Sequence, residues 1–396
     1  MKKSLVALAV LGAFAGIASA QSSVTLFGVL DVNARYVKNG DNNVKSLSTD
    51  GINSSRLGFR GVEDLGGGLK AGFWLEAAIN PDTGTTNTTA AGVSTASKFF
   101  NRRSTVSLMG GFGELRLGRD YVPAFWNLTI FDPFGTNGVG AYTNVITGGA
   151  LGVAAATTLV RADNSIGYFL PSGLGGFYGQ AMVAAGEGQT TSNPGSVTCP
   201  AGGGACTVVQ PGPGNSAAFP TQAANKHYGG RVGYAAGPFD VAVSYAQNQI
   251  TSNNDFKFYN AAASWDFGIA KVTGQYGSME YTTIKNKLYQ FGLIAPLGAG
   301  EIHASYSAND GQGYLGTNTP RAKASDTTGS FDADNAKQYA VGYLYNLSKR
   351  TAVYGNYAQI NNDGLQRSLV AGNPAVPSTA RDVKSTGFEL GLRHSF

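Results

Sequence analysis

The chain ends in the sequence STGFELGLRHSF, residues 385–396, in which apolar side chains recur at almost every second position. Phe388, Leu390, Leu392 and Phe396 fall on one face of an extended chain, and mostly polar or small residues fall on the other. Successive side chains of a β-strand point to opposite faces, so this pattern predicts a strand with one apolar and one polar face.

The same alternation recurs upstream. Residues 239–246, FDVAVSYA, and residues 301–307, EIHASYS, again alternate between apolar and polar or small side chains. A soluble β-sandwich and a transmembrane β-barrel both contain such strands. The segments that separate the strands therefore decide between these two fold classes.

Short and longer connections take turns along the chain. The seven short connections are residues 63–68, 110–113, 171–176, 236–238, 266–269, 296–300 and 347–350. The eight other connections, often long and polar, are residues 38–51, 81–97, 122–160, 187–226, 250–254, 282–286, 308–336 and 361–383. Fifteen connections join sixteen strands. Their strict alternation is typical of an outer-membrane barrel with short periplasmic turns and long external loops.

The composition supports a membrane barrel over a soluble fold. The chain has 56 glycines and only 13% charged residues, whereas soluble globular domains have about 25%. No stretch reaches the roughly 18 consecutive apolar residues that a membrane-crossing helix needs. We therefore predict an all-β fold, a transmembrane 16-stranded antiparallel β-barrel that encloses an aqueous channel.

The N-terminus has the pattern of an export signal. Two lysines precede an apolar run at residues 5–17, and residues 18–20, Ala-Ser-Ala, form a small-residue cleavage pattern. The run of about 13 residues is too short for a transmembrane anchor, which needs roughly 20. We predict a cleaved signal peptide at residues 1–20 and a β-barrel over residues 21–396.

Charge and cysteine content argue against other functional classes. Removing residues 1–20 leaves 27 basic and 24 acidic residues, and this net charge of +3 without a basic run argues against nucleic-acid binding. Cys199 and Cys206 lie in a Gly/Pro-rich stretch, which favours a local disulfide over a metal or redox pair. The three histidines are scattered, so we predict no metal, no cofactor and no catalytic residue.

Seven short segments occur from the first predicted strand to the last: SVTLFG at 23–28, SRLGFRG at 55–61, EDLGGGLK at 63–70, FNR at 100–102, GRDY at 118–121, NSIGY at 164–168 and GLRHSF at 391–396. Together they resemble the general trimeric porins of Gram-negative bacteria, especially those of betaproteobacteria. The resemblance implies an outer-membrane channel, not an enzyme, through which small anions and hydrophilic solutes diffuse. It also implies a homotrimer in contact with membrane lipid and lipopolysaccharide.

In this family the third external loop folds into the barrel and narrows it, and residues 122–160 correspond to that loop. Asp132, in the sequence DPFG, matches the acidic turn at its tip and is the only acid in the loop. Leu57 and Phe59 are apolar and should face lipid, so alternation turns Arg56 and Arg60 toward the lumen. The resemblance further implies a ladder of Arg56, Arg102 and Arg161 on the wall opposite the loop, with Arg103 as a spare candidate because the register near Arg102 is uncertain by one. The predicted constriction residues are Arg56, Arg60, Arg102, Arg103, Asp132 and Arg161.

Several arginines opposite a single loop acid predict a positive constriction and a preference for anions. In the alternative, acids such as Asp31 or Glu389 pair with these arginines and cancel their charge. Other functional alternatives are a substrate-specific outer-membrane channel for an anionic or sugar-like solute, a barrel enzyme and a surface adhesin. Finally, the terminal Phe396 resembles the signal that the barrel-assembly machinery reads.

Overall fold

The computed structural model describes residues 23–86, 98–147, 159–186, 197–198, 207–208, 226–249, 255–281, 284–312, 314–315, 319–320, 334–363, 368–371 and 382–396. The predicted signal peptide at residues 1–20 and both cysteines, Cys199 and Cys206, lie outside these residues. The described chain is mostly strand, and one of its loops contains two helices.

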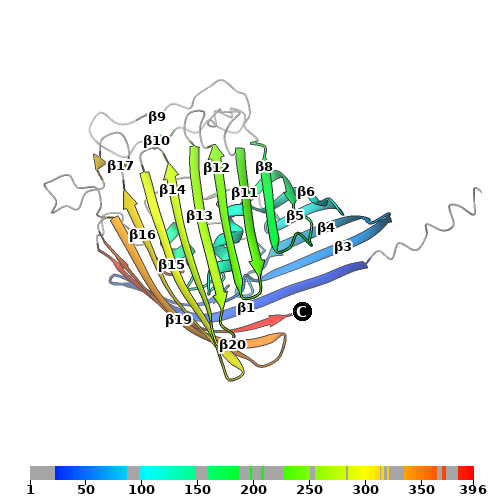
Figure 1. Ribbon diagram of the computed structural model, residues 1–396. Coiled ribbons are helices and arrows are strands. Elements are labelled where there is room, and N and C mark those ends of the chain that lie inside the picture. Colours follow the sequence, from blue (N-terminus) through cyan, green and yellow to red (C-terminus); the bar gives the residue numbers. More distant parts are fainter. Residues whose placement is uncertain are drawn as a thin grey trace, which may run out of the picture.

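One seventeen-stranded sheet forms the described barrel (Figure 1). Its strands are β1 (Ser23–Asn39), β2 (Asn42–Thr49), β3 (Arg56–Gly66), β4 (Leu69–Ala78), β5 (Arg103–Gly110), β6 (Gly113–Tyr121), β7 (Arg161–Phe169), β8 (Phe177–Ala184), β11 (Lys226–Ala236), β12 (Phe239–Gln249), β13 (Asp255–Asp266), β14 (Lys271–Tyr281), β15 (Ile284–Leu297), β16 (Gly300–Gln312), β19 (Asp334–Asn346), β20 (Thr351–Asn362) and β21 (Lys384–Ser395). Separate two-residue strands pair as β9 (Val197–Thr198) with β10 (Thr207–Val208), and β17 (Tyr314–Leu315) with β18 (Thr319–Pro320).

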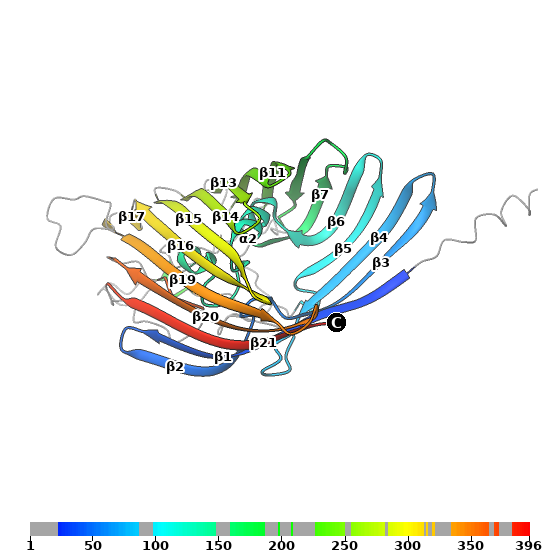
Figure 2. The same cartoon turned by 60° about the horizontal axis from the view of Figure 1, so that its bottom comes forward.

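The sheet closes on itself because β1 pairs with the last strand, β21. On its other side β1 pairs with β3 over residues 23–29 and with β2 over residues 32–39, so β2 and β3 share one position. The seventeen described strands therefore occupy sixteen antiparallel positions around the barrel (Figure 2). The predicted fold class is confirmed. Closure leaves no sheet edge whose backbone N–H and C=O groups would lack hydrogen-bond partners in lipid.

All seven predicted short turns join consecutive strands where the sequence predicts them. Between β5 and β6, for example, the strands end at Gly110 and begin again at Gly113. Gly113 has φ +110°, in the region that favours glycine, and an added Cβ would lie 2.2 Å from the carbonyl oxygen of Phe169. A side chain at this position would therefore disrupt the turn.

The predicted loop at residues 38–51 is wrong in its extent. Residues 42–49 form β2, which pairs with β1 after a turn at Gly40. Likewise, β16 continues to Gln312, although the sequence predicts a loop from residue 308. These extensions lack the alternation signal because a strand beyond the lipid still needs hydrogen-bond partners but no apolar outer face.

Side-chain exposure follows the predicted alternation, with apolar residues outside. On β21, Phe388, Leu390 and Leu392 are 44%, 55% and 50% exposed, whereas Ser385 and Glu389 are fully buried. The outward apolar side chains form the surface that contacts lipid, and the inward polar side chains line the interior.

The described part of the third loop lies inside the barrel, as predicted. It occupies residues 122–160 between β6 and β7, and its described part contains α2 (Pro123–Phe131) and α3 (Thr143–Thr147). α2 contacts β11, β12, β13 and β14, and Figure 2 shows it within the ring of strands. Among the described residues no helix is long and apolar enough to cross a membrane.

Candidate functional site

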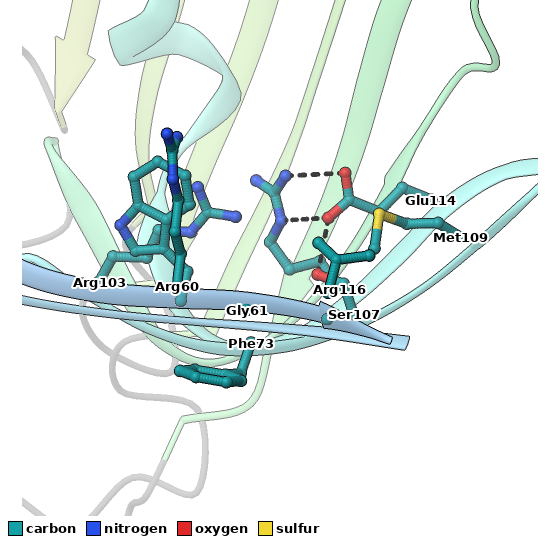
Figure 3. A pocket seen from close by; sticks show the side chains of 11 residues that line it. Arg60, Gly61, Phe73, Arg103, Ser107, Met109, Glu114 and Arg116 are labelled. Atoms are coloured by element: carbon teal, nitrogen blue, oxygen red, sulfur yellow. Dashed lines mark hydrogen bonds and ion pairs between the residues drawn. The ribbon is translucent and has the colours of Figure 1, made fainter. Parts of the chain in front are cut away.

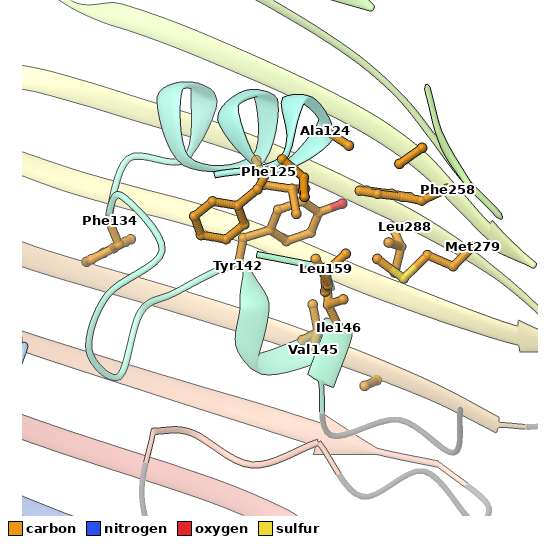
Figure 4. Packing of buried hydrophobic residues seen from close by; sticks show 14 of the residues in the cluster. Ala124, Phe125, Phe134, Tyr142, Val145, Ile146, Leu159, Phe258, Met279 and Leu288 are labelled. Atoms are coloured by element: carbon orange, nitrogen blue, oxygen red, sulfur yellow. The ribbon is translucent and has the colours of Figure 1, made fainter. Parts of the chain in front are cut away.

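An apolar patch on the inner wall receives the third loop. Phe258 on β13, Met279 on β14 and Leu288 on β15 are almost completely buried. They belong to one cluster with Phe125 of α2 and with Tyr142, which follows α2 in the loop (Figure 4). Apolar residues thus occupy inward positions where the loop covers them, and this contact fixes the loop against one side of the barrel.

Hydrogen bonds also hold the loop against several wall strands, among them β13, β15 and β19. Asn260 of β13 donates to the carbonyl of Ala124 at 3.0 Å, and Gln290 of β15 donates to the carboxylate of Asp132 at 2.9 Å. Gln338 of β19 donates to two carbonyls between α2 and α3, at 2.9 and 3.0 Å. In Figure 2 these strands lie across the barrel from β3, β4 and β5, so the loop is held opposite that wall.

Asp132 holds the turn that follows α2. Its carboxylate accepts hydrogen bonds from the backbone of Phe134, Thr136 and Tyr142, at 3.1, 2.9 and 2.9 Å, and from the side chain of Gln290. Burial raises the pKa of the Asp132 carboxyl, and these four hydrogen bonds counter that rise. Because Asp132 is only 5% exposed, its charge has little access to the lumen.

Nine charged side chains form a basic wall across β3–β7. The basic wall consists of Arg56, Arg60, Arg102, Arg103, Arg116 and Arg161 with Glu76, Glu114 and Asp120. The register brings them together because β3, β4, β5, β6 and β7 are successive neighbours in the sheet. All five predicted arginines belong to the wall, and Arg102 and Arg103 both reach it.

Glu76 on β4 pairs with two of the predicted arginines. Its carboxylate lies 2.5 Å from Nε of Arg102 and 3.5 Å from Nη1 of Arg56. The indole of Trp74 also donates to it, at 3.0 Å. Arg102, whose side chain is 8% exposed, further donates to the hydroxyl of Tyr121 at 2.9 Å. Arg102 is therefore buried, and it connects Glu76 of β4 to Tyr121 of β6 within the basic wall.

Arg103 and Arg116 share Asp120. Arg116 contacts both oxygens of Glu114 at 2.8 and 2.9 Å and one oxygen of Asp120 at 2.5 Å. Nε of Arg103 lies 3.7 Å from Asp120, and its guanidinium carbon lies 4.5 Å from the ring centre of Trp74. Glu114 and Asp120 therefore neutralise the charge of Arg116, and Asp120 offsets only part of the charge of Arg103.

Arg60 and Arg161 have no carboxylate partner in the described part of the chain. The guanidinium carbon of Arg60 lies 5.4 Å from the ring centre of Phe27 and 5.3 Å from that of Trp74. That of Arg161 lies 4.4 Å from the ring centre of Tyr121. With six arginines and three carboxylates, the basic wall has three excess positive charges.

Asp31 and Glu389 are engaged away from the basic wall. Glu389 pairs with Arg35 at 3.0 Å. Asp31 accepts hydrogen bonds from the backbone of residues 51–53 and from the hydroxyl of Tyr354. In the described ion pairs neither carboxylate reaches an arginine of the basic wall. Part of the charge cancellation considered from the sequence comes instead from Glu76, which pairs with Arg56 and Arg102, and from Asp120, which lies near Arg103.

The sequence prediction missed Arg116, Glu76 and the aromatic residues beneath the arginines. A signal for Arg116 existed, because Leu115 and Leu117 on either side of it are 38% and 42% exposed on the outer face. Alternation then points Arg116 inward, as it does Arg56. Alternation likewise places Glu76 inward, since Phe73 on the same strand is exposed on the outer face. No local signal shows its pairing with Arg56 and Arg102, which lie elsewhere in the chain.

Known proteins are similar to this sequence over most or all of its length. The family model described as Gram-negative porin matches residues 7–365. Outer membrane porin protein 32 of Delftia acidovorans is 38% identical over 409 aligned positions, which cover 100% of both chains. An outer membrane porin protein of Bordetella pertussis is 30% identical over 438 aligned positions, again covering 100% of both chains.

Solved structures share the fold as well. An anion-selective porin from Comamonas acidovorans is 33% identical to the chain and superposes with a TM-score of 0.71, covering 95% of this chain and 100% of that one. OmpT of Vibrio cholerae superposes with a TM-score of 0.60 over 96% of this chain and 99% of its own, at 14% identity. At that identity the second likeness extends to the fold alone.

Proposed function

The chain belongs to the Gram-negative porin family, and on that premise we propose that its channel passes small anions in preference to cations. It is an outer-membrane porin, a channel and not an enzyme. The proposal rests on one observation: the basic wall sets six arginines against three carboxylates, while the only acid of the third loop is buried. The anion-selective relative from Comamonas acidovorans supports the same conclusion.

Fixed charge beside a narrow passage acts on every ion that enters it. Guanidinium groups stay protonated at any relevant pH. A unit charge roughly 7 Å from an ion in water changes the energy of that ion by about 0.6 kcal/mol. Three excess charges therefore raise the local concentration of anions and lower that of cations. The proposed constriction ladder comprises Arg56, Arg60, Arg102, Arg103 and Arg161, together with Arg116, while Asp132 shapes the loop that faces it.

A potassium chloride gradient across a planar bilayer tests the proposal. We expect an anion-sided reversal potential for the wild type. The R60Q/R161Q double variant removes the two arginines of the basic wall that have no carboxylate partner among the described residues, so its chloride-to-potassium permeability ratio should fall more than about tenfold. R350Q is the matched control, because Arg350 is exposed in the short turn between β19 and β20. A cation-sided potential for the wild type would overturn the proposal.

Replacing Glu76 with glutamine should strengthen the anion preference. The change leaves Arg56 and Arg102 without their carboxylate and adds one net positive charge to the basic wall. By the same Coulomb argument, the added charge favours the anion and disfavours the cation by about 0.6 kcal/mol each, so the permeability ratio should rise about sevenfold. The reversal potential measures this, with E63Q on the exposed end of β3 as the control. An unchanged potential in E76Q would show that the wall does not set the selectivity.

We also propose that the protein works as a homotrimer among membrane lipid and lipopolysaccharide. Outward apolar residues support this, since Val24 and Leu26 on β1 are 66% and 54% exposed and need a cover of lipid or of a neighbouring copy. The OmpT protein of Vibrio cholerae, which shares the fold, has been solved in a trimer form. Cleavage of residues 1–20 and recognition of Phe396 by the barrel-assembly machinery complete the proposed route to the outer membrane.

A further inference from the structure

A pocket opens into the basic wall on the side of the short turns (Figure 3). Its volume is about 330 Å³, and its lining includes Arg60, Trp74, Arg103, Met109 and Arg116. Figure 3 shows the three arginines on one side of the strands and Phe73 on the opposite side. Small-molecule sites measure about 300–1,000 Å³, so this pocket has the size for one small ligand.

Two glycines shape the pocket. A Cβ at Gly72 would lie 2.8 Å from Cε of Met109, so glycine leaves room for the methionine in the pocket floor. A Cβ at Gly58 would lie 2.3 Å from Cζ of Phe27. The absence of that Cβ lets the Phe27 ring lie across β3, where it makes an edge contact with Trp74, 4.9 Å between ring centres.

The aromatic rings fix the orientation of the guanidinium groups. Arg60 lies near both Phe27 and Trp74, Arg103 lies over Trp74, and Arg116 lies over Phe169 with its guanidinium carbon 3.9 Å from the ring centre. A guanidinium packed against a ring keeps its N–H groups available at its edge. Three arginines in one pocket are therefore held with little rotational freedom.

Their hydrogen-bonding capacity is used unequally. Arg116 donates three hydrogen bonds to Glu114 and Asp120, and Arg103 donates through Nε to the hydroxyl of Thr105 at 3.1 Å. Arg60 is exposed and has neither an acid nor a hydrogen-bond acceptor in the contacts of the described residues. Among the three arginines of this pocket, Arg60 is thus the one whose N–H groups make no hydrogen bond in the described contacts and are all available to a ligand.

We propose that this pocket binds an aromatic carboxylate in transit through the channel. The Arg60 guanidinium matches a carboxylate with two parallel hydrogen bonds, and the flat apolar body of the ligand contacts Trp74 and Met109. An inorganic anion would use the arginine alone, and a sugar would lack partners on the apolar floor. The inference rests on the proposed function, because the ligand reaches the pocket through an anion-preferring channel.

Titration of the folded wild type in detergent micelles with benzoate tests the inference by calorimetry. Acetate and benzyl alcohol serve as probes that lack the ring or the charge. Benzoate should bind at least about tenfold more tightly than either, because it alone buries the ring and pairs with Arg60. R60Q should weaken benzoate binding by about tenfold, R60K by less because it keeps the charge, and R350Q should bind as the wild type does.

The reversal potential, recorded on the same preparations, reports the proposed function separately. Equal binding of benzoate and acetate would overturn the aromatic specificity and leave an anion channel. Absence of benzoate binding beside an anion-sided potential would overturn the inference alone. Benzoate binding that R60Q leaves unchanged would place the site elsewhere and also overturn it. Circular dichroism of each variant establishes that the barrel has folded.

Discussion

Replacing Asp132 with alanine should release the third loop from its turn and raise the single-channel conductance. The substitution leaves three backbone N–H groups and the amide of Gln290 without their acceptor. Each unsatisfied buried donor costs about 1–3 kcal/mol, so four of them strongly destabilise the position that the turn has in the wild type. We expect the loop to leave its position and the passage beside the basic wall to widen.

Single-channel recording measures the expected change, and limited proteolysis of the folded protein reports the position of the loop. D132N should give an intermediate effect because the amide retains one acceptor oxygen. D41A is the matched control, since Asp41 is exposed in the turn between β1 and β2. Wild-type conductance and protease resistance in D132A would show that the apolar contacts of the loop suffice to hold it.

Deleting Phe396 should reduce the amount of folded protein in the outer membrane more strongly than it reduces stability. The backbone of Phe396 exchanges two hydrogen bonds with Gly28, at 3.0 and 3.1 Å, where the last strand meets the first. Its ring lies so close that a Cβ on Gly28 would be 2.3 Å from Cζ. Two lost hydrogen bonds cost about 2 kcal/mol, which a barrel closed by the rest of the β1–β21 ladder tolerates.

Two measurements separate assembly from stability. The level of folded protein in outer-membrane fractions reports assembly in cells, and refolding of purified chain into detergent reports stability alone. We expect a large loss in the first and a small one in the second. F388A is the control, because Phe388 is another outward aromatic of β21 that leaves the terminus intact. Equal losses in both measurements would show that Phe396 acts only through the stability of the barrel and not as an assembly signal.

Much of the fold was predictable from local pattern. The alternation around Phe388 and Leu390 arises because lipid surrounds the barrel and water fills it. Every spanning strand must therefore follow the same rule, with apolar side chains pointing outward and polar ones inward. Glycine-rich turns such as 110–113 and the loop bounds 122–160 follow from where the alternation stops. β2 was not predictable in this way, since outside the lipid the rule no longer applies and only pairing with β1 reveals the strand.

The candidate site was predictable only in part. Alternation identified Arg56 and Arg60, because orientation on a strand is a local property. It did not identify Glu76 as their neighbour on β4, nor the burial of Arg102 beneath Tyr121. Those contacts join residues of different strands, and their geometry depends on register and on the course of each side chain.

The class of the molecule can be predicted from sequence: sixteen strands with apolar outer and polar inner faces, one loop long enough to enter the barrel, and arginines at inward positions. How these charges act depends on contacts between strands that are distant in sequence. The tertiary structure turned Asp132 into the anchor of the third loop, paired Arg102 with Glu76 and left Arg60 and Arg161 without acids in the described chain. The physical reason is that the side of the sheet to which a residue points follows from its position along one strand, where side chains alternate with a period of two. The electrostatic potential in the lumen depends instead on the distances between charged groups on different strands.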